Sequence, residues 1–387
     1  MEWPAAQGRV KARKLVANNI AFTVAGHEDD ADLRALLRSN VTDGWIRLAL
    51  AREPDAFVAA ATMGRRHGYI VARDTQTREP VGMCEWSARD CYVDGKPRLL
   101  AYLGALRVAP RYRHRLGVLK GGFAAVRQLL QDDRATPYAL TAIASDNHTA
   151  LRLLGTNLPG MPAYRPLETF STFALRPRAT LRSPWNRNTI DVEHARREDL
   201  SAIAVCLDRT YRQYQFAPLW RARDLNDPAR CNGLRPDDFL IVRRGPGIAG
   251  CLALWDQSEF KQTIVQGYAG QLGWLRPFAN LAAPLLQTPH LPAPSELLSQ
   301  VFFSHLAVED NDIDLFRSLI RAALAEARRR GHALALVGLA TRHPLAQVLT
   351  HDYRAREYRT LLHLVHWNQA DELPSTTRLP HVEIAVL

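Results

Sequence analysis

The stretch Leu103–Gly122 constrains the fold more than any other part of the chain. It reads LGALRVAPRYRHRLGVLKGG: a strand-like run ends at Val108, a basic cluster follows, and Gly117 precedes apolar residues at helical spacing over 118–130. A strand, a basic turn and a helix start bring free backbone N–H groups and the positive end of a helix dipole to one place. The sequence therefore predicts a binding site for a phosphorylated cofactor here.

The length and composition of the chain indicate a globular protein with two folded units. Its 387 residues exceed what a single compact core usually holds, and 47% of them are hydrophobic while 23% are charged. The basic start lacks the apolar run of a secretory signal, and prolines interrupt the weakly polar stretch 264–293. The five cysteines form no CxxC pair, so neither a disulfide framework nor a metal site is predicted. We expect a soluble, cytoplasmic protein without a membrane span.

The net charge of +11 allows two interpretations. It can mark a nucleic-acid surface, or it can reflect general basicity with a local site for an anionic cofactor. The chain has only five lysines, and its arginines are spread along the whole length rather than gathered in one stripe. This dispersed pattern favours the second interpretation, so we expect no nucleic-acid partner.

A segment rich in proline and arginine predicts a boundary between two domains. Residues 177–188 lack apolar periodicity, so we expect domains at 1–176 and 189–387. In the first domain the pattern predicts strands at 20–25, 69–72, 81–87, 91–93, 99–108, 138–144 and 164–175, and helices at 29–39, 55–63, 118–131 and 147–154. In the second it predicts strands at 189–192, 239–243, 248–255, 301–308 and 332–339, and helices at 197–211 and 314–330. Asp94-Gly95 predicts a hairpin, and 256–300 stays unassigned.

Two motifs, separated by one predicted helix and one predicted strand, carry a family resemblance. They are Val108-Ala109-Pro110 with Arg113, Arg115 and Gly117, and then Asn147, Ala150 and Leu153. With the element order over about residues 18–176, they resemble the GNAT superfamily of N-acyltransferases. The resemblance implies an α/β (α+β) fold of two tandem GNAT-like domains, each with a mixed, mostly antiparallel central sheet flanked by helices. It implies acetyl-CoA or another acyl-CoA as cofactor, held by Leu106, Arg107, Val108, Arg113, His114, Arg115, Leu116, Gly117, Val118 and Asn147.

The chain departs from the pattern of this superfamily at several positions. Leu116 stands where the first glycine of the pyrophosphate turn falls, and Leu154 stands where a proton-donating tyrosine often follows the second motif. In the second half, the corresponding turn over 309–314 carries four carboxylates, which would repel a diphosphate by several kcal/mol. We therefore expect the cofactor in the first half, and a degenerate second half that is structural or that walls off the acceptor substrate.

Acyl transfer from a thioester to an amine needs a proton acceptor, an oxyanion donor and no covalent nucleophile. The resemblance assigns the oxyanion donor to a backbone N–H near Leu106–Val108. Glu85 is the candidate base, and an exposed carboxylate on a strand edge is the alternative interpretation. Tyr102 and Tyr164 are candidate proton donors, although buried tyrosines are commonly structural. Asn147 can equally cap its own helix.

The sequence thus predicts an acyl-CoA-dependent N-acyltransferase that moves an acetyl or other acyl group to an amine by direct attack. The acceptor is a small-molecule amine or a peptide amine, and its identity, the acyl length and the oligomeric state stay open. The alternative hypothesis is a catalytically silent GNAT-like protein that binds acyl-CoA in a regulatory role, which Leu154 motivates.

Overall fold

The structure is a computed structural model that describes residues 15–17, 19–42, 46–132, 135–177, 190–270, 272–286, 291–367 and 373–387. The strands of its main sheet are β1 (Leu15–Ala17), β2 (Ile20–Val24), β5 (Arg66–Asp74), β6 (Pro80–Val93), β7 (Lys96–Val108), β8 (Tyr138–Ala144), β9 (Ala163–Leu175), β10 (Glu193–His194), β11 (Phe239–Arg244), β12 (Gly247–Trp255), β14 (Gln300–Val308), β15 (Leu334–Ala340) and β16 (Arg356–His366). The helices are α1 (Asp30–Arg38), α2 (Ala56–Ala61), α3 (Leu116–Asp132), α4 (His148–Leu154), α5 (Leu200–Tyr211), α6 (Ala222–Leu225), α7 (Leu272–Leu286), α8 (Ile313–Arg329) and α9 (Ala346–Tyr353).

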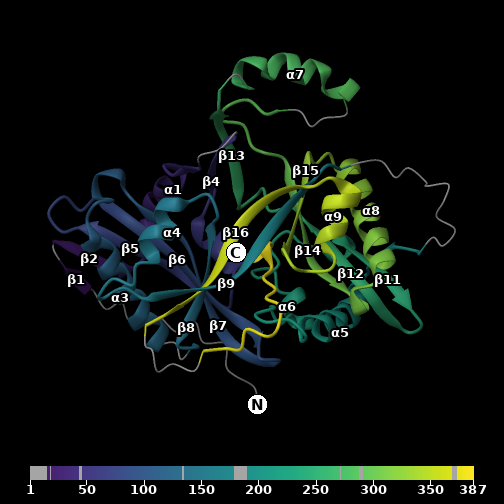
Figure 1. Cartoon of the computed structure of the whole chain (residues 1–387), viewed down its shortest axis with the longest axis horizontal. Helices are drawn as coiled ribbons and strands as arrows, with labels where there is room; N and C mark the ends of the chain where they lie inside the picture. Colours follow the sequence, from purple (N-terminus) through teal and green to yellow (C-terminus); the bar gives the residue numbers. More distant parts are fainter. Residues whose placement is uncertain are drawn as a thin grey trace.

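One continuous sheet of 13 strands runs across the molecule, in the order β1-β2-β5-β6-β7-β8-β16-β9-β15-β14-β12-β11-β10 (Figure 1). The neighbours β7 and β8 are parallel, as are β14 and β15, and the remaining neighbours are antiparallel. The predicted fold class, a mixed and mostly antiparallel sheet flanked by helices, is confirmed.

The two halves of the sheet exchange their last strands. β16, from the end of the chain, pairs with β8 over Tyr138–Ala144 and also with β9. β9, from the first half of the chain, pairs in turn with β15 of the second half. The sheet therefore has no break between the halves. The division into domains at 1–176 and 189–387 stays a prediction, and residues 178–188 of its linker lie outside the described residues.

The predicted hairpin at Asp94-Gly95 joins β6 to β7, with φ of 50° and 75° at the two turn residues. Both angles are positive, which is what a two-residue turn of this kind requires. β6 is longer than the strands predicted over 81–87 and 91–93, because both of its faces are buried. The strand predicted at 189–192 is wrong for its described residues, since β10 begins at Glu193. β16 and α9 were not assigned from the sequence.

The helices of the first half lie on opposite faces of the sheet. α3 packs on β2, β5 and β6, where an added Cβ at Gly121 would come within 2.2 Å of the Phe22 ring. Only glycine lets α3 approach the strands so closely. α1 and α2 pack on the other face, where the Tyr69 hydroxyl lies 2.9 Å from the carbonyl oxygen of Ala56. The two faces are called the α3 face and the α1 face below.

The unassigned interval 256–300 contains a strand, β13 (Gln262–Tyr268), and helix α7. β13 pairs with β4 (Ile46–Ala51), and β4 with β3 (Val41–Thr42), in a small second sheet. The interval thus belongs to a sheet built from both halves of the chain. α7 projects away from the rest of the structure (Figure 1), with Trp274 and Leu281 more than four-fifths exposed. Among the described residues, no helix is long and apolar enough to cross a membrane.

Three of the buried histidines in the second half and along its border with the first have strongly lowered pKa values. Burial lowers the pKa of His305 and of His381 to about 3, and that of His343 to about 4. The ring of His381 lies against Tyr211, with centroids 4.7 Å apart, and its Nε2 atom has no hydrogen-bond partner in the described structure. These rings cannot take up a proton until the pH is well below their ordinary value of 6.5.

We predict that acidification destabilises the fold in part through these histidines. Below pH 6.5 the unfolded chain binds protons that the native chain does not, so each histidine reduces the free energy of unfolding by about 1.4 kcal/mol per pH unit down to its native pKa. Glu383 has the opposite effect, because burial raises the pKa of its carboxyl group in the native chain to about 7. As the pH falls from about 7 to 4.5, this carboxyl group increases the free energy of unfolding. The melting temperature, measured at pH 7, 6 and 5, should therefore fall less steeply with decreasing pH in His381→Asn than in the wild type. Parallel curves for the two proteins would contradict this assignment.

Candidate acyl-CoA site

The turn after β7 leads into α3 and leaves backbone donors unused. α3 begins at Leu116, before the predicted start of the helix at 118. The N–H groups of Leu116 and Gly117 have no acceptor within the described residues, whereas that of Val118 donates to the carbonyl of Arg115 at 3.0 Å. α3 has 17 residues, so its full positive end faces this turn. Free N–H groups at the positive end of a helix form an anion site.

Two basic residues of this turn, Arg113 and Arg115, have no acidic partner at ion-pair distance among the described residues. In the described structure no carboxylate lies within 4.0 Å of Arg113 or Arg115, whereas Arg111 is paired with Glu79. Arg113 donates to Val108 O at 3.3 Å and to Asn40 Oδ1 at 3.1 Å, and the guanidinium of Arg115 lies 4.8 Å from the centre of the Tyr112 ring. His114 is exposed. The two arginines flank the free N–H groups and reinforce the anion site.

β7 parts from β8 just before this turn. The strands pair only at Ala101 with Ala139 and at Tyr102 with Leu140, and beyond these residues they diverge. β7 then bulges against β6: Ala105, with φ of 44°, and Leu106 have no register partner, although Gly104 and Arg107 do. A bulge at the edge of a split re-aims backbone groups away from the regular ladder. This bulge lies within the same strand that leads into the basic turn before α3.

Glu85 and Tyr102 lie together on the α1 face, on either side of Gly104. A Cβ at Gly104 would lie 3.6 Å from Glu85 Oε2 and 3.2 Å from Tyr102 Cε1. Glu85 is only 2% exposed, so the alternative of a solvated edge carboxylate is wrong. Its Oε1 atom is 2.9 Å from the Tyr69 hydroxyl, and its Oε2 atom is 3.9 Å from Arg52 Nη2. Glu85 is thus a buried carboxylate held beside the bulge.

The tyrosines predicted as proton donors occupy different sites. Burial raises the pKa of Tyr102 to about 12, so its hydroxyl keeps its proton at neutral pH. Tyr164 is separate from Glu85 and Tyr102: it packs on the side of α3, with its ring centre 6.2 Å from that of Phe123. Burial raises the pKa of Tyr164 well above its ordinary value. The structure therefore brings Glu85 and Tyr102 together but not Tyr164.

The side chain of Asn147 caps its own helix. Its Oδ1 atom accepts a hydrogen bond from the N–H of Ala150 at 3.1 Å, at the start of α4. Of the two functions that the sequence left open, capping is the one observed, and a contact of Asn147 with a cofactor stays a prediction.

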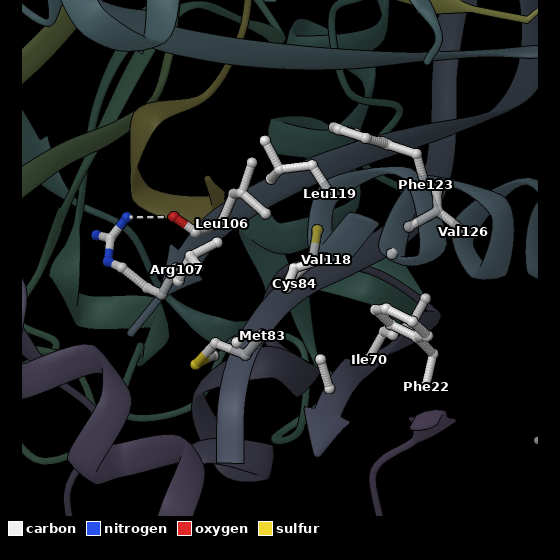
Figure 2. Close-up of a pocket in the computed structure, with 14 residues that line it drawn as sticks. Phe22, Ile70, Met83, Cys84, Leu106, Arg107, Val118, Leu119, Phe123 and Val126 are labelled. Atoms are coloured by element: carbon white, nitrogen blue, oxygen red, sulfur yellow. Dashed lines mark hydrogen bonds between the residues drawn. The ribbon is translucent and has the colours of Figure 1, made fainter. Parts of the chain in front are cut away.

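A small apolar pocket lies between α3 and the sheet. Figure 2 shows Leu119, Phe123 and Val126 of α3 on one side of it, and Ile70 and Cys84 of the sheet on the other. Leu106, Arg107, Val108 and Val118, four of the predicted cofactor residues, line it as well. The guanidinium of Arg107 turns away to donate to Leu106 O at 3.0 Å, which leaves the lining apolar (Figure 2). The cavity begins next to the bulge.

The second half has a similar strand split, bulge and helix start, but its own side chains occupy the space beside them. β14 parts from β15 after Phe302 and has a bulge at His305, with φ of 51°. The N–H of His305 donates to Glu383 at 2.8 Å, and its ring packs on Trp220. At the start of α8, the Asp312 carboxylate accepts from the N–H groups of 314 and 315. In the second half, side chains of the chain itself therefore occupy the positions that correspond to the bulge and to the start of α3.

Three buried cations near Glu85 were not found from the sequence: Arg52, Arg89 and Lys261. They come from β6 and from the ends of β4 and β13, so only the pairing of β4 with β13 brings them together. The sequence offered one sign of this cluster: polar and charged residues stand at alternate positions of β6, among them Glu85 and Arg89.

Solved structures of a GCN5-related N-acetyltransferase and of an N-myristoyltransferase share this fold. A GCN5-related N-acetyltransferase from Sphaerobacter thermophilus superimposes with a TM-score of 0.59 at 13% identity, over 90% of this chain and 96% of that one. The N-myristoyltransferase of Saccharomyces cerevisiae, in a structure with bound myristoyl-CoA, gives a TM-score of 0.59 at 12% identity, over 98% and 94%. No protein-family model and no curated protein matches the sequence. At these identities the likeness shows the fold, and the chain has the GNAT fold.

We predict that Arg113→Ala combined with Arg115→Ala weakens coenzyme A binding. The Kd should rise roughly 10-fold to 100-fold for each hydrogen bond to phosphate that is removed, since hydrogen bonds to charged groups contribute about 1.5–3 kcal/mol. Isothermal titration measures the Kd. Arg111→Ala is the matched control, because Arg111 lies on the same turn but is paired with Glu79. Equal losses in the control and in the double variant would show that general charge, and not this site, binds the cofactor.

Proposed function

We propose that this chain is an acyl-CoA-dependent N-acyltransferase whose cofactor site lies in its first half. One observation carries the proposal: the free N–H groups at the start of α3 and the bulge at Ala105 lie on one continuous segment, beside the split between β7 and β8. The same strand can therefore present backbone groups both to a diphosphate at the turn and to a thioester at the bulge. The corresponding places in the second half are occupied by Asp312 and Glu383.

The residues present fit an acyl-CoA. Leu116, Gly117, Arg113 and Arg115 supply donors and positive charge for the diphosphate, and the apolar cavity suits the acyl group. The bound cofactor supplies a thioester that an amine can attack. The lining of this pocket carries no polar feature that selects one acyl group, so the proposal covers acetyl and other acyl groups.

Glu85 takes the proton of the acceptor amine in this proposal. It lies beside Gly104, one residue before the bulge, and is held there by Tyr69. A backbone N–H of Leu106–Val108 donates to the oxygen that becomes negative as the amine attacks. Tyr102 keeps its proton at neutral pH and can donate a hydrogen bond on the same face. The acceptor is a small-molecule or peptide amine, and the cytoplasmic location stays a prediction.

The test of the function is thiol release from acetyl-CoA and longer acyl-CoAs with a broad panel of amines. The proposal expects release that depends on both the thioester and an amine. The alternative, a silent acyl-CoA-binding protein, is motivated by Leu154 and expects cofactor binding by isothermal titration without release of thiol for any amine. Lack of binding at millimolar cofactor would contradict both.

We predict that Glu85→Gln lowers kcat about 100-fold or more, because general base catalysis contributes typically 10²–10⁴-fold. Glutamine keeps the shape of the side chain, so the Kd for the cofactor should stay unchanged. Glu79→Gln, a carboxylate exposed at the surface of the same half, is the control and should keep its kcat. An active Glu85→Gln enzyme would remove Glu85 from the mechanism.

A further inference from the structure

The α1 face of the sheet carries a buried polar row that leads away from the bulge. Glu85, Ser87 and Arg89 alternate along β6 and point to this face, and all three are less than a tenth exposed. Arg52 and Lys261 approach the same row from the small second sheet, where they directly flank the cross-strand pair Ala51 and Gln262. Residues from both halves of the chain thus enclose one interior region beside Gly104.

The basic side chains of this region have few close carboxylate partners. Arg52, Arg89 and Lys261 are 7%, 5% and 8% exposed. Within the described residues, the only carboxylate that approaches any of them to 4.0 Å is that of Glu85, at 3.9 Å from Arg52. Arg89 donates to the carbonyl of Val386, and Lys261 to that of Ala385 at 3.1 Å. Carbonyl groups solvate these side chains without compensating a positive charge, and burial accordingly lowers the pKa of Lys261 well below its ordinary value and that of Arg89 to about 10.

Three buried polar groups in this region also lack hydrogen-bond partners within the described structure. They are the Nε atom of Arg52, the Oε1 atom of Gln257 and the hydroxyl of Ser87, which is fully buried. Buried polar side chains without a partner are rare, and a bound ligand is one of the ordinary reasons for them. Two small pockets border the cluster: one is lined by Arg89, Tyr102 and Glu383, and the other by Gln257, Lys261 and Gln262.

We propose that the acceptor amine carries a carboxylate, as an amino acid does, and that Arg52 and Lys261, with Arg89, bind this carboxylate while Glu85 receives the amine. The inference rests on the proposed function and names its acceptor class. An amino acid carries one charge of each sign. Its ammonium group is complementary to Glu85, and its carboxylate is complementary to the basic side chains beside Glu85. A single negative charge is favoured over a phosphate dianion, since Glu85 would repel the second charge.

The first test compares matched acceptors. Amino acids are assayed against their amides and against the corresponding amines without a carboxylate, and phosphorylated amines are included. We expect kcat/KM at least about 30-fold higher for the carboxylates, mainly through KM. Equal use of amines with and without a carboxylate, or a preference for phosphorylated amines, would overturn the inference while leaving the transferase function intact.

The second test removes the charge of Lys261. Lys261→Met, of similar length, should lower kcat/KM for carboxylate acceptors at least about 10-fold, keep activity on their amides within about 3-fold, and keep the Kd for coenzyme A. Lys261→Arg should restore most of the loss. Arg47→Gln, at an exposed position of β4, is the control and should match the wild type. If Lys261→Met does not fold, Arg52→Gln takes its place.

A binding measurement distinguishes failure of the carboxylate site from failure of the transferase function. The same amino acids are titrated calorimetrically onto the full chain saturated with coenzyme A, where no turnover occurs. Binding that depends on Lys261, without thiol release from any acyl-CoA, would refute the transferase function but support the carboxylate site. Binding that Lys261→Met leaves unchanged would refute the site.

Discussion

The parting of β7 from β8 is the constraint on which the rest of the site depends. A parallel pair that separates after two residues leaves the inner edges of both strands without their ladder partners. Each buried N–H or C=O left unsatisfied costs about 1–3 kcal/mol. On their outer edges both strands stay paired, β8 with β16 over Tyr138–Ala144 and β7 with β6, so each strand is held in place beside the split. The exchanged strand therefore holds the split open and at the same time joins the two halves of the chain.

The two halves share a strand split and a bulge, and they differ in whether side chains fill the space beside these features. Both have a split between parallel strands and a bulge with positive φ, at Ala105 in β7 and at His305 in β14. The small side chain of Ala105 fills little of the space beside it. His305 instead packs among Trp220, Trp255 and Phe239, and its N–H is bound by Glu383. The second half contributes to the site in another way, through β13 and Lys261, which close the α1 face of the first half.

Local features of the site could be predicted from the sequence, whereas long-range ones could not. The turn at Asp94-Gly95, the basic turn and the start of α3 follow from residues within a few positions of one another, and the structure contains all three. Burial of Glu85 depends on Tyr69 and Arg52, and the pairing of β16 with β8 joins residues more than 200 positions apart. No periodicity in one segment encodes which distant segment will cover it. The cations at 52, 89 and 261 were missed for this reason.

The segment from the bulge to the first turn of α3 is the part of the chain to which we assign cofactor binding. Hydrogen exchange of backbone amides, followed by mass spectrometry with and without coenzyme A, tests this assignment without relying on turnover. We predict slower exchange over 104–118 when coenzyme A is bound, and no change over the corresponding segment 305–316. Protection at 305–316, or unchanged exchange at 104–118 in protein saturated with coenzyme A, would contradict it.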